Sequence, residues 1–422
     1  MIETQPGASW SATHVYGAGR LIFPRTVDEL REAVRTTERI RALGTRHSFN
    51  DIADRVGTLV SLRDLEGEVR IDRGANTAWV PAGWSYGAVA TVLEDAGLAL
   101  PNLGSLPHIS VAGACAVGTH GSGVRQRNLS ASVSAIELVD AAGEVRVVDR
   151  VDPDFGGSVI HLGALGIATR LRLDVLPTYL MRQDVFVDLP WSQLVSELDG
   201  ILSGAYSVSV FTAFGEPMAR QVWLKSRVDD YVLEAEDTYF GAAPVGTRLV
   251  SPEDAANDNT TVQGGVPGPW VERLPHFRHD ATPSNGDEIQ SEYFVARPDG
   301  PAALEALREI GNEIDPLLLI SELRTVAADR QWLSPAYDRD SLCIHFTWKN
   351  DPDGVRRVLP LVERALAPFD PRPHWGKWFA MDVASIARLY PRLGDFAALA
   401  GRVDPDGKFR NRYLDRVLGL RG

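Results

Sequence analysis

The chain has 422 residues, of which 44% are hydrophobic, and a formal net charge of −13. Single cores stop growing beyond about 250–300 residues, so we expect two domains, each with enough apolar residues to form its own core. The acidic balance argues against nucleic acid as a partner, because binding to phosphates requires a concentrated basic face. An anionic membrane surface is disfavoured for the same reason.

Residues 1–6 (MIETQP) contain neither the basic nor the apolar region of a signal peptide. No window of the sequence reaches the roughly 18 apolar residues of a membrane-spanning helix, so we expect a cytoplasmic protein without a membrane partner. The two cysteines, Cys115 and Cys343, are too few and too far apart to indicate a disulfide framework or a zinc site. We expect both to be buried thiols and expect no metal ion.

Residues 21–177 alternate short β-branched runs with amphipathic helices. The first helix starts near residue 26, where Thr26 is a candidate N-cap and Glu29 completes a capping box. Two hairpins are predicted over residues 69–80 and 137–148, because each has two short strands around a turn sequence. Gly97 should close a helix over residues 86–98, and residues 166–175 alternate like a strand. This half is therefore predicted to be α+β.

The pattern changes near residues 177–179, where longer strands begin. Residues 241–285 are rich in Pro, Gly, Asn and Asp and predict a long irregular excursion. We expect a second α+β domain with helices packed on one face of a largely antiparallel sheet. Its predicted strands are residues 207–211, 221–224, 320–326 and 342–348, and its predicted helices begin at residue 302 and cover residues 355–366.

Two loops in the first half could hold a large anionic cofactor. His47 lies in a polar loop, residues 44–50, directly after the apolar run 40–43, and residues 110–123 form a second loop rich in glycine. Small residues let backbone amides approach a pyrophosphate closely. The chain has neither a GxGxxG that follows a strand nor a GxxxxGK[ST], which disfavours a Rossmann or P-loop site. From composition alone, His47 could equally be a loop histidine bonded to backbone, and the second loop an ordinary surface loop.

A polar surface is predicted in the second half. The two-residue period of a strand places Glu322 and Arg324 on one face, and His345 and Thr347 on one face of another strand. If the two strands pair, these donors and acceptors suit a row of hydroxyl groups. A solvated sheet face is the alternative. Lys377 stands between Trp375 and Trp378, which is unusual for a charged residue, although a surface lysine has the same pattern.

Six segments of the chain, in the same order, closely resemble the alditol oxidases, which include xylitol oxidase and are FAD enzymes of the vanillyl-alcohol-oxidase type. The resemblance extends over nearly the whole chain. Its motifs are LGTRHSFN (43–50), LPNLGSLPHISVAG (100–113), GTHG (118–121), SELRTV (321–326), HWGK (374–377) and DPDGKF (404–409).

The resemblance implies a two-domain α+β flavoenzyme. Its parts would be an FAD-binding domain over residues 1–178, a substrate-binding cap domain over 179–376 and a C-terminal segment, 377–422, that returns to the first domain. His47 matches the histidine that is bonded covalently to the flavin. The other implied FAD contacts are Leu43, Gly44, Thr45, Arg46, Ser48, Ser105, Ser110, Gly113, Val117, Gly118, Thr119, His120, Ile167 and Ala168. At Thr45 and Arg46 this chain departs from relatives that have smaller residues there.

The implied reaction is oxidation of the terminal hydroxyl of a polyol, such as xylitol or sorbitol, to the aldose, with reduction of oxygen to hydrogen peroxide. The substrate residues would be Ser105, Glu322, Arg324, Thr347 and Lys377, and the catalytic residues Lys377, Arg324, Glu322 and His345. Arg324 and Lys377 could stabilise an alkoxide, or a neutral Lys377 or His345 could take the proton. Gly104 would leave room for oxygen.

Two other functions remain open at this point. The chain could be an aldonolactone oxidase or dehydrogenase of the same superfamily, or a carbohydrate-binding protein without catalysis. We expect a monomer that acts on a small polyol and oxygen.

Overall fold

The computed structural model describes residues 2–3, 6–230, 238–246, 259–281 and 286–419. Its N-terminal part begins with a four-stranded sheet in the order β1-β2-β4-β3, in which β2 and β3 both pair in parallel with β4. The helix α1 crosses from β2 to β3. The bounds are β1 (Ile2–Glu3), β2 (Arg20–Ile22), α1 (Val27–Thr36), β3 (Ile40–Ala42) and β4 (Thr58–Val60).

The predicted start of α1 is confirmed. The Thr26 hydroxyl accepts a hydrogen bond from the Glu29 amide at 3.2 Å, which satisfies one free donor of the first turn. The Glu29 carboxylate accepts from the amide of Arg25 at 2.8 Å. The reciprocal bond of the capping box therefore reaches one residue further back than expected.

A second sheet of five strands, in the order β5-β6-β10-β8-β9, contains both predicted hairpins. The helix predicted over residues 86–98 is three residues too long, because α2 ends at Asp95 and Gly97, at φ +72°, turns the chain into β7. The bounds are β5 (Arg70–Asp72), β6 (Thr77–Pro81), α2 (Tyr86–Asp95), β7 (Leu98–Ala99), α3 (Val111–Ala116), β8 (Val133–Val139), β9 (Val145–Asp149), α4 (Phe155–Ser158), β10 (Ile167–Asp174) and β11 (Leu176–Pro177).

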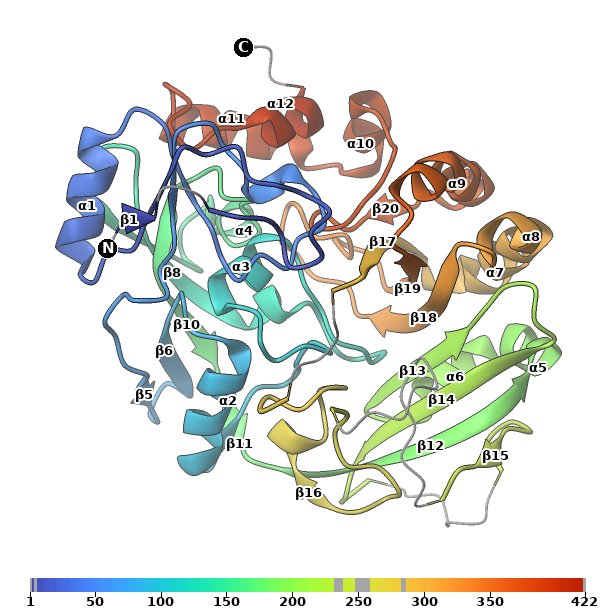
Figure 1. The fold of residues 1–422 in the computed structure, drawn as a ribbon. Helices are drawn as coiled ribbons and strands as arrows, with labels where there is room; N and C mark the ends of the chain where they lie inside the picture. The colour runs from blue at the N-terminus through green and yellow to red at the C-terminus, as the bar shows by residue number, and fades with distance from the viewer. Residues whose placement is uncertain (1, 4–5, 231–237, 247–258, 282–285, 420–422) are drawn as a thin grey trace.

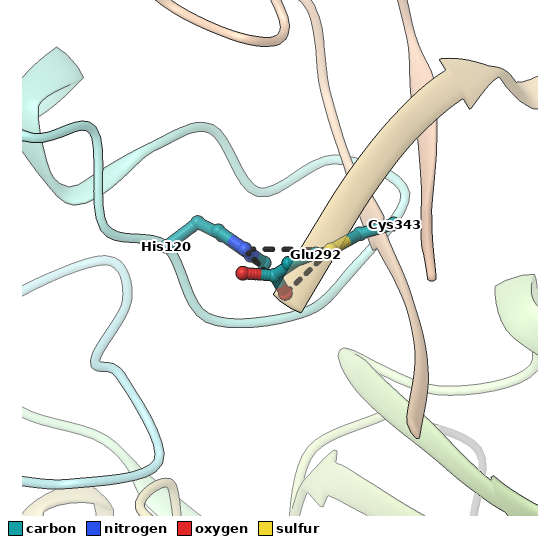
Figure 2. A group of neighbouring side chains, drawn as sticks. All are labelled: His120, Glu292 and Cys343. Atoms are coloured by element: carbon teal, nitrogen blue, oxygen red, sulfur yellow. Dashed lines mark hydrogen bonds and ion pairs between the residues drawn. The ribbon is translucent and has the colours of Figure 1, made fainter. Parts of the chain in front are cut away.

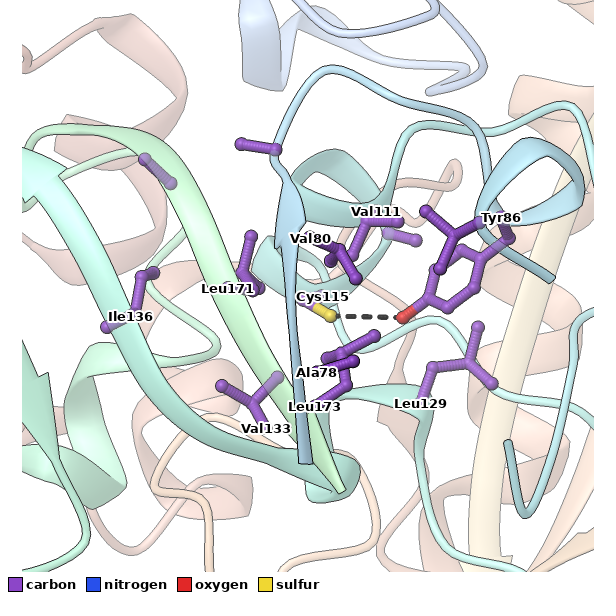
Figure 3. Packing of buried hydrophobic residues seen from close by; sticks show 14 of the residues in the cluster. Ala78, Val80, Tyr86, Val111, Cys115, Leu129, Val133, Ile136, Leu171 and Leu173 are labelled. Carbon is purple, nitrogen blue, oxygen red and sulfur yellow. Dashed lines mark hydrogen bonds between the residues drawn. The ribbon is translucent and has the colours of Figure 1, made fainter. Parts of the chain in front are cut away.

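The core of the N-terminal part lies between this sheet and the helices α2 and α3. Figure 3 shows Val80 and Leu171 from neighbouring strands packed beside Val111 of α3. Cys115 is part of this core, and its thiol lies 3.2 Å from the hydroxyl of Tyr86. Burial raises the pKa of Cys115 to about 12, so it is a structural thiol, as predicted.

The second part is a nine-stranded antiparallel sheet in the order β15-β12-β14-β13-β18-β19-β17-β20, with β16 paired to β12. The helices α5 to α9 cover one face of it and share a core with it (Figure 1), so the predicted α+β fold is confirmed. The strands are β12 (Leu180–Pro190), β13 (Ser207–Thr212), β14 (Met218–Arg227), β15 (Ala243–Pro244), β16 (Gly268–Pro269), β17 (Glu288–Ala296), β18 (Leu318–Val326), β19 (Ser341–Lys349) and β20 (Arg372–Pro373).

The sequence prediction contains no strand over β17, which is one of the central strands of this sheet. The excursion predicted over residues 241–285 lies partly outside the described residues, and its described part contains only β15, β16 and one 3-10 helix. The helices of this part are α5 (Trp191–Ser196), α6 (Leu198–Ser203), α7 (Gly300–Glu309), α8 (Gly311–Ile314) and α9 (Pro352–Leu366).

The C-terminal helices, drawn in red in Figure 1, lie against the N-terminal part. The Asn411 side chain donates to the carbonyl of Ile52 at 3.0 Å, and Arg416 pairs with Asp51 at 2.7 Å. These contacts are compatible with a returning C-terminal segment, while the limits at residues 178 and 376 stay a prediction. The helices are α10 (Val383–Leu389), α11 (Leu393–Val403) and α12 (Arg412–Leu418), and short 3-10 helices cover Asp51–Ala53, Leu129–Ser132, Trp270–Glu272, Arg297–Asp299 and Ala367–Phe369. Among the described residues, no helix has the length and apolar character needed to cross a membrane.

Candidate active site

A cavity of about 800 Å³ lies between the N-terminal part and the large sheet. It is lined by every site residue predicted above except Gly118 and Ile167. Ile167 is fully buried in the core, because the alternation of β10 turns Gly166 and Ala168 to the cavity instead. Gly118 adopts φ +72° and faces Pro335 and Ile160. Ile167 and Gly118 therefore do not line the cavity.

One wall of the cavity is the loop of residues 44–50 packed against the start of α3. A Cβ atom on Gly44 would lie 2.9 Å from the Ser110 hydroxyl, and one on Gly113 would lie 2.8 Å from it, so a side chain at either position would displace that hydroxyl. The Thr45 hydroxyl accepts a hydrogen bond from the Ser110 amide at 3.3 Å. The two glycine-containing loops therefore meet and leave exposed backbone beside the cavity, which is the cradle that a pyrophosphate needs.

His47 presents a neutral imidazole to the cavity. Burial lowers its pKa to about 4, with a smaller contribution from His108, and Trp10 stacks on the ring at 5.3 Å between centroids. Its Nδ1 atom is buried and has no hydrogen-bond partner among the described residues. A buried nitrogen with a free lone pair is costly unless another group occupies it. The cavity thus presents a buried imidazole with an unpartnered nitrogen beside the two loops, which fits a large cofactor at this wall.

The opposite wall is the polar face of β18 and β19, as the strand periodicity predicted. Glu322 stands directly across from His345 in the sheet, while Ile344, Phe346 and Trp348 point into the core under the helices. Nε of Arg324 lies 3.6 Å from the Glu322 carboxylate, and a terminal nitrogen of Arg324 donates to the Ser105 hydroxyl at 3.4 Å. The strands pair, so the predicted polar floor is present, buried between the two parts rather than solvated.

The centre of this floor is Glu292 of β17, which sequence reasoning missed. Its Oε1 accepts from Arg324 at 2.6 Å, and its Oε2 accepts from Lys377 at 2.6 Å. Burial alone would raise the pKa of Glu292, but the charges of Lys377, His120 and Arg324 outweigh burial and hold it well below its usual range. Glu292 is therefore an ionised carboxylate that holds two cations at the floor of the cavity.

A sequence signal for this strand existed. Glu288, Gln290 and Glu292 alternate with apolar or small residues, the same pattern that identified β18 and β19. In the sheet Gln290 stands across from Thr347, and Glu292 across from His345, so all three strands contribute to one polar face. Other polar cavity residues that the sequence analysis missed include Asn259, His276, His374, His161 and Arg41.

Lys377 reaches the floor through contacts between two distant loops. The Asn50 amide donates to the carbonyls of Trp375 and Lys377, both at 2.8 Å, and the Phe49 amide donates to Gly376 at 2.8 Å. Nζ of Lys377 lies 2.7 Å from Nδ1 of His345. Burial lowers the pKa of Lys377, although Glu292 opposes the shift. Burial and the charge of Lys377 lower the pKa of His345 to about 4, so its imidazole is neutral.

His120, Glu292 and Cys343 form a buried cluster that could be mistaken for a metal site (Figure 2). Nε2 of His120 lies 3.2 Å from Oε1 of Glu292, and the Cys343 thiol donates to the same oxygen at 2.7 Å. That oxygen also accepts from Arg324, and a metal ion there would be repelled by two neighbouring cations. Burial raises the pKa of Cys343 well above its usual value, so it remains a thiol. The cluster is a hydrogen-bonded support for Glu292.

Comparison with known proteins agrees with this site. The family model "FAD binding domain" matches residues 18–149, and the model "D-arabinono-1,4-lactone oxidase" matches residues 284–417. The chain is 44% identical to an alditol oxidase of Streptomyces sp. over 413 aligned residues. The alignment covers 97% of this chain and 98% of that protein. It is 27% identical to L-gulono-1,4-lactone dehydrogenase of Mycobacterium tuberculosis, over 98% of this chain and 99% of that one.

Among solved structures, cholesterol oxidase from B. sterolicum superposes with a TM-score of 0.81 and 14% sequence identity, over 99% of this chain and 97% of that chain. This likeness shows the fold alone. The cradle beside Gly44 and Gly113, the unpartnered nitrogen of His47 and the 44% identity over nearly the full length agree with one another. The chain belongs to the alditol oxidase family and is an FAD-dependent oxidoreductase.

Proposed function

We propose that this protein is an alditol oxidase, which oxidises the terminal hydroxyl of a polyol such as xylitol or sorbitol to the aldose. The observation that carries the proposal is the buried row of ionised and hydroxyl groups on β18 and β19, opposite His47. Such a row offers both donors and acceptors to successive hydroxyls, and each group is already oriented by a partner within the protein. The 44% identity to an alditol oxidase supports the same substrate class.

The hydrogen bonds within the floor indicate which of its groups can donate to a substrate hydroxyl and which can accept from it. With the hydrogen of neutral His345 on Nε2, Nδ1 accepts from Lys377 at 2.7 Å and Nε2 donates to the Thr347 hydroxyl at 3.1 Å. Thr347 then has its own hydrogen available for a substrate oxygen. Burial raises the pKa of Glu322, but Arg324 and His276 outweigh burial and hold it below its usual range, so Glu322 accepts from a substrate hydroxyl.

Lys377 is the proposed base. Two directions around its Nζ are used by Glu292 and His345, and the remaining one is free for the substrate, since Lys377 lines the cavity. The lowered pKa brings the neutral amine, with a lone pair in that direction, closer to neutral pH. Both nitrogens of His345 are already in hydrogen bonds, which makes it a poorer acceptor. Arg324 stays charged and stabilises the alkoxide that forms as the proton leaves.

FAD would be held by the loops around Gly44 and Ser110 and bonded covalently through His47. When bound, FAD would supply the two-electron oxidant for the carbinol carbon, with oxygen as the final acceptor and hydrogen peroxide as the product. Gly104 lines the cavity without a side chain, and a Cβ there would make ordinary contacts from 3.6 Å outwards, so its absence leaves room of that size for oxygen. We also propose that the protein is a cytoplasmic monomer.

Oxidation of an aldonolactone is the second candidate, because residues 284–417 match the model of D-arabinono-1,4-lactone oxidase. Both substrates are polyhydroxylated, but the reacting hydroxyl of a lactone is on the ring near a carbonyl, whereas that of a polyol is on a flexible terminal carbinol. A floor in which Glu322 is ionised favours a hydroxyl over a carbonyl oxygen at that position, since a carboxylate can only accept.

The two functions are separated by anaerobic reduction of the flavin. We expect xylitol or sorbitol to bleach the flavin absorption under argon, and peroxide to form when oxygen is admitted. Gulono- and galactono-lactone should reduce it at least about tenfold more slowly, because one mismatched hydrogen bond to a charged group costs about 1.5–3 kcal/mol. Faster reduction by a lactone would assign the second function, and no bleaching by any of these compounds would contradict both.

A further inference from the structure

Lys225, a residue outside the cavity, is connected to the substrate floor through one histidine. It lies on β14 and is only 1% exposed. Its Nζ donates to the carbonyls of Leu274 and Pro275 at 2.6 and 2.9 Å and lies 2.8 Å from Nδ1 of His276. These three acceptors match the three hydrogens of an ammonium group. Burial lowers the pKa of Lys225 well below its usual value, and Glu322 opposes the shift, so the ammonium form depends on these three acceptors.

His276 continues the connection to Glu322. Its Nε2 lies 2.8 Å from Oε1 of Glu322 and 3.4 Å from the hydroxyl of Ser209. Glu322 is ionised, so Nε2 must carry the hydrogen and donate it. Burial and the charge of Lys225 lower the pKa of His276 to about 4, so Nδ1 has no hydrogen and accepts from Lys225. One arrangement of protons therefore satisfies the whole chain from Lys225 to Glu322.

The segment that contains His276 is held firmly. The amides of His276 and Phe277 both donate to the carbonyl of Ser105, each at 3.2 Å, and the Thr261 hydroxyl donates to Pro275 at 2.7 Å. The ring of His276 also contacts Trp223 at 5.0 Å between centroids. The imidazole thus has little freedom to turn away from Glu322, and its protonation is the property that Lys225 can control.

We propose that Lys225 is a positioning residue for the substrate, which keeps His276 neutral with its hydrogen on Nε2, so that His276 orients Glu322 without cancelling its charge. Lys225 itself touches no substrate, because it is absent from the cavity lining. The charged or titratable groups that face His276 are Lys225 on β14 and Glu322 and Arg324 on β18. Lys225 and Arg324 disfavour an imidazolium, whereas Glu322 favours it, and removal of Lys225 would shift this balance toward protonation.

The same arrangement occurs at the other end of the floor, where Lys377 faces Nδ1 of His345 and the Nε2 hydrogen goes to Thr347. The Lys377–His345 pair thus leaves the Thr347 hydrogen available for donation. The Lys225–His276 pair keeps Glu322 an acceptor. The proposal deepens the proposed function, because it concerns how the same site recognises hydroxyl groups.

The first test is Lys225→Met in the holoenzyme, with kcat and KM for xylitol measured between about pH 5 and 9. In the variant, the pKa of His276 should rise into this range. Below that pKa the KM should rise on the order of tenfold, because an imidazolium neutralises the Glu322 carboxylate that accepts from the substrate. The kcat at saturating xylitol should change less. Lys349→Met is the matched control, since Lys349 of β19 donates to the carbonyl of Pro316 at 2.8 Å and has no contact with His276.

The double variant Lys225→Met/His276→Gln sharpens the test. Glutamine can donate to Glu322 but cannot take a proton at these pH values, so the acid rise in KM should disappear. A KM and pH profile of Lys225→Met that match the wild type would overturn the proposal, and so would an acid rise that persists in the double variant, because a merely structural role for Lys225 would give that result.

A second measurement does not depend on the folding of any Lys225 variant or on activity. In wild-type holoenzyme with ¹⁵N-labelled histidine, and with the His276 signals assigned by their absence in His276→Gln, Nδ1 should be unprotonated and Nε2 protonated throughout the same pH range. A protonated Nδ1 would contradict the proposal. Because no substrate is present, this result stands apart from the proposed function, which fails only if no polyol reduces the flavin.

Discussion

His47 and Lys377 are the two residues on which the chemistry of the site depends most directly. Burial lowers the pKa of both residues, to about 4 at His47 and, against the opposing charge of Glu292, at Lys377. A neutral imidazole and a readily neutral amine are nucleophilic or basic, whereas their protonated forms are not. Burial beside the cavity therefore prepares one residue for a covalent bond and the other for proton transfer.

The covalent bond at His47 can be tested by colour. Wild-type protein precipitated with acid should keep its yellow colour, because a carbon–nitrogen bond to the flavin survives unfolding. His47→Ala should give a colourless pellet, even if FAD still binds the folded protein. His108→Ala is the control, since His108 is another loop histidine of the N-terminal part whose pKa is lowered by burial, yet it does not line the cavity. A colourless wild-type pellet would contradict covalent attachment.

The role of Lys377 can be tested by rate and pH. Lys377→Met should slow anaerobic flavin reduction by about 10²–10⁴-fold, the usual effect of removing a general base. In the wild type the rate should rise with pH and level off below the ordinary lysine pKa of 10.5, because the amine is the active form and its pKa is lowered. Lys349→Met serves as control. An unchanged rate in Lys377→Met, or a wild-type rate that falls as pH rises, would contradict the assignment.

The polar floor is a property of three strands rather than of any one of them. Glu292 on β17 holds Arg324 of β18, accepts from the Cys343 thiol of β19 and binds Lys377 from the segment after β20. Periodicity in the sequence identified two of these strands. The strand β17 was missed, although its residues alternate in the same way, because this strand directly follows a segment rich in turn residues.

Removal of the Glu292 charge should disturb the whole floor. Glu292→Gln leaves Arg324 and Lys377 buried side by side without the carboxylate, which should reduce the free energy of unfolding by about 3–5 kcal/mol. Urea denaturation would measure the loss, and Glu309→Gln, a change at an exposed position of α7, should have almost no effect. A Glu292→Gln variant as stable as the wild type would show that the cations do not depend on this carboxylate.

At the scale of the whole molecule, buried neutral histidines connect stability to pH. Burial is the largest cause that lowers the pKa of His161, His276 and His345 from 6.5 to about 4. Between these pH values the unfolded chain binds protons that the folded protein does not, so stability falls as the pH decreases from 6.5 to 4. At pH 5 each such histidine should cost about 2 kcal/mol.

A single variant can test this acid sensitivity. His161→Asn retains an acceptor for the amide of Gly163, which bonds to Nδ1 of His161 at 3.1 Å, but cannot take up a proton. Compared by urea denaturation at pH 7.5 and pH 5, the variant should lose about 2 kcal/mol less than the wild type on acidification. Equal losses in the two proteins would mean that His161 is not held neutral by the fold.

The sequence by itself determined the local parts of this protein. The N-cap at Thr26, the two hairpins and the polar faces of β18 and β19 follow from interactions between residues close in the chain or from strand period. The motifs were also sufficient to indicate the family. These features are short-range, so composition and spacing carry them.

Only the tertiary structure decided which residues meet. It brought Asn50 against Trp375, placed Glu292 between Arg324 and Lys377, and joined Lys225 to Glu322 through His276. These contacts link residues far apart in the chain, and their charges depend on burial, which no spacing reveals. The protonation states that the proposed chemistry requires therefore arise from packing between the two parts of the molecule.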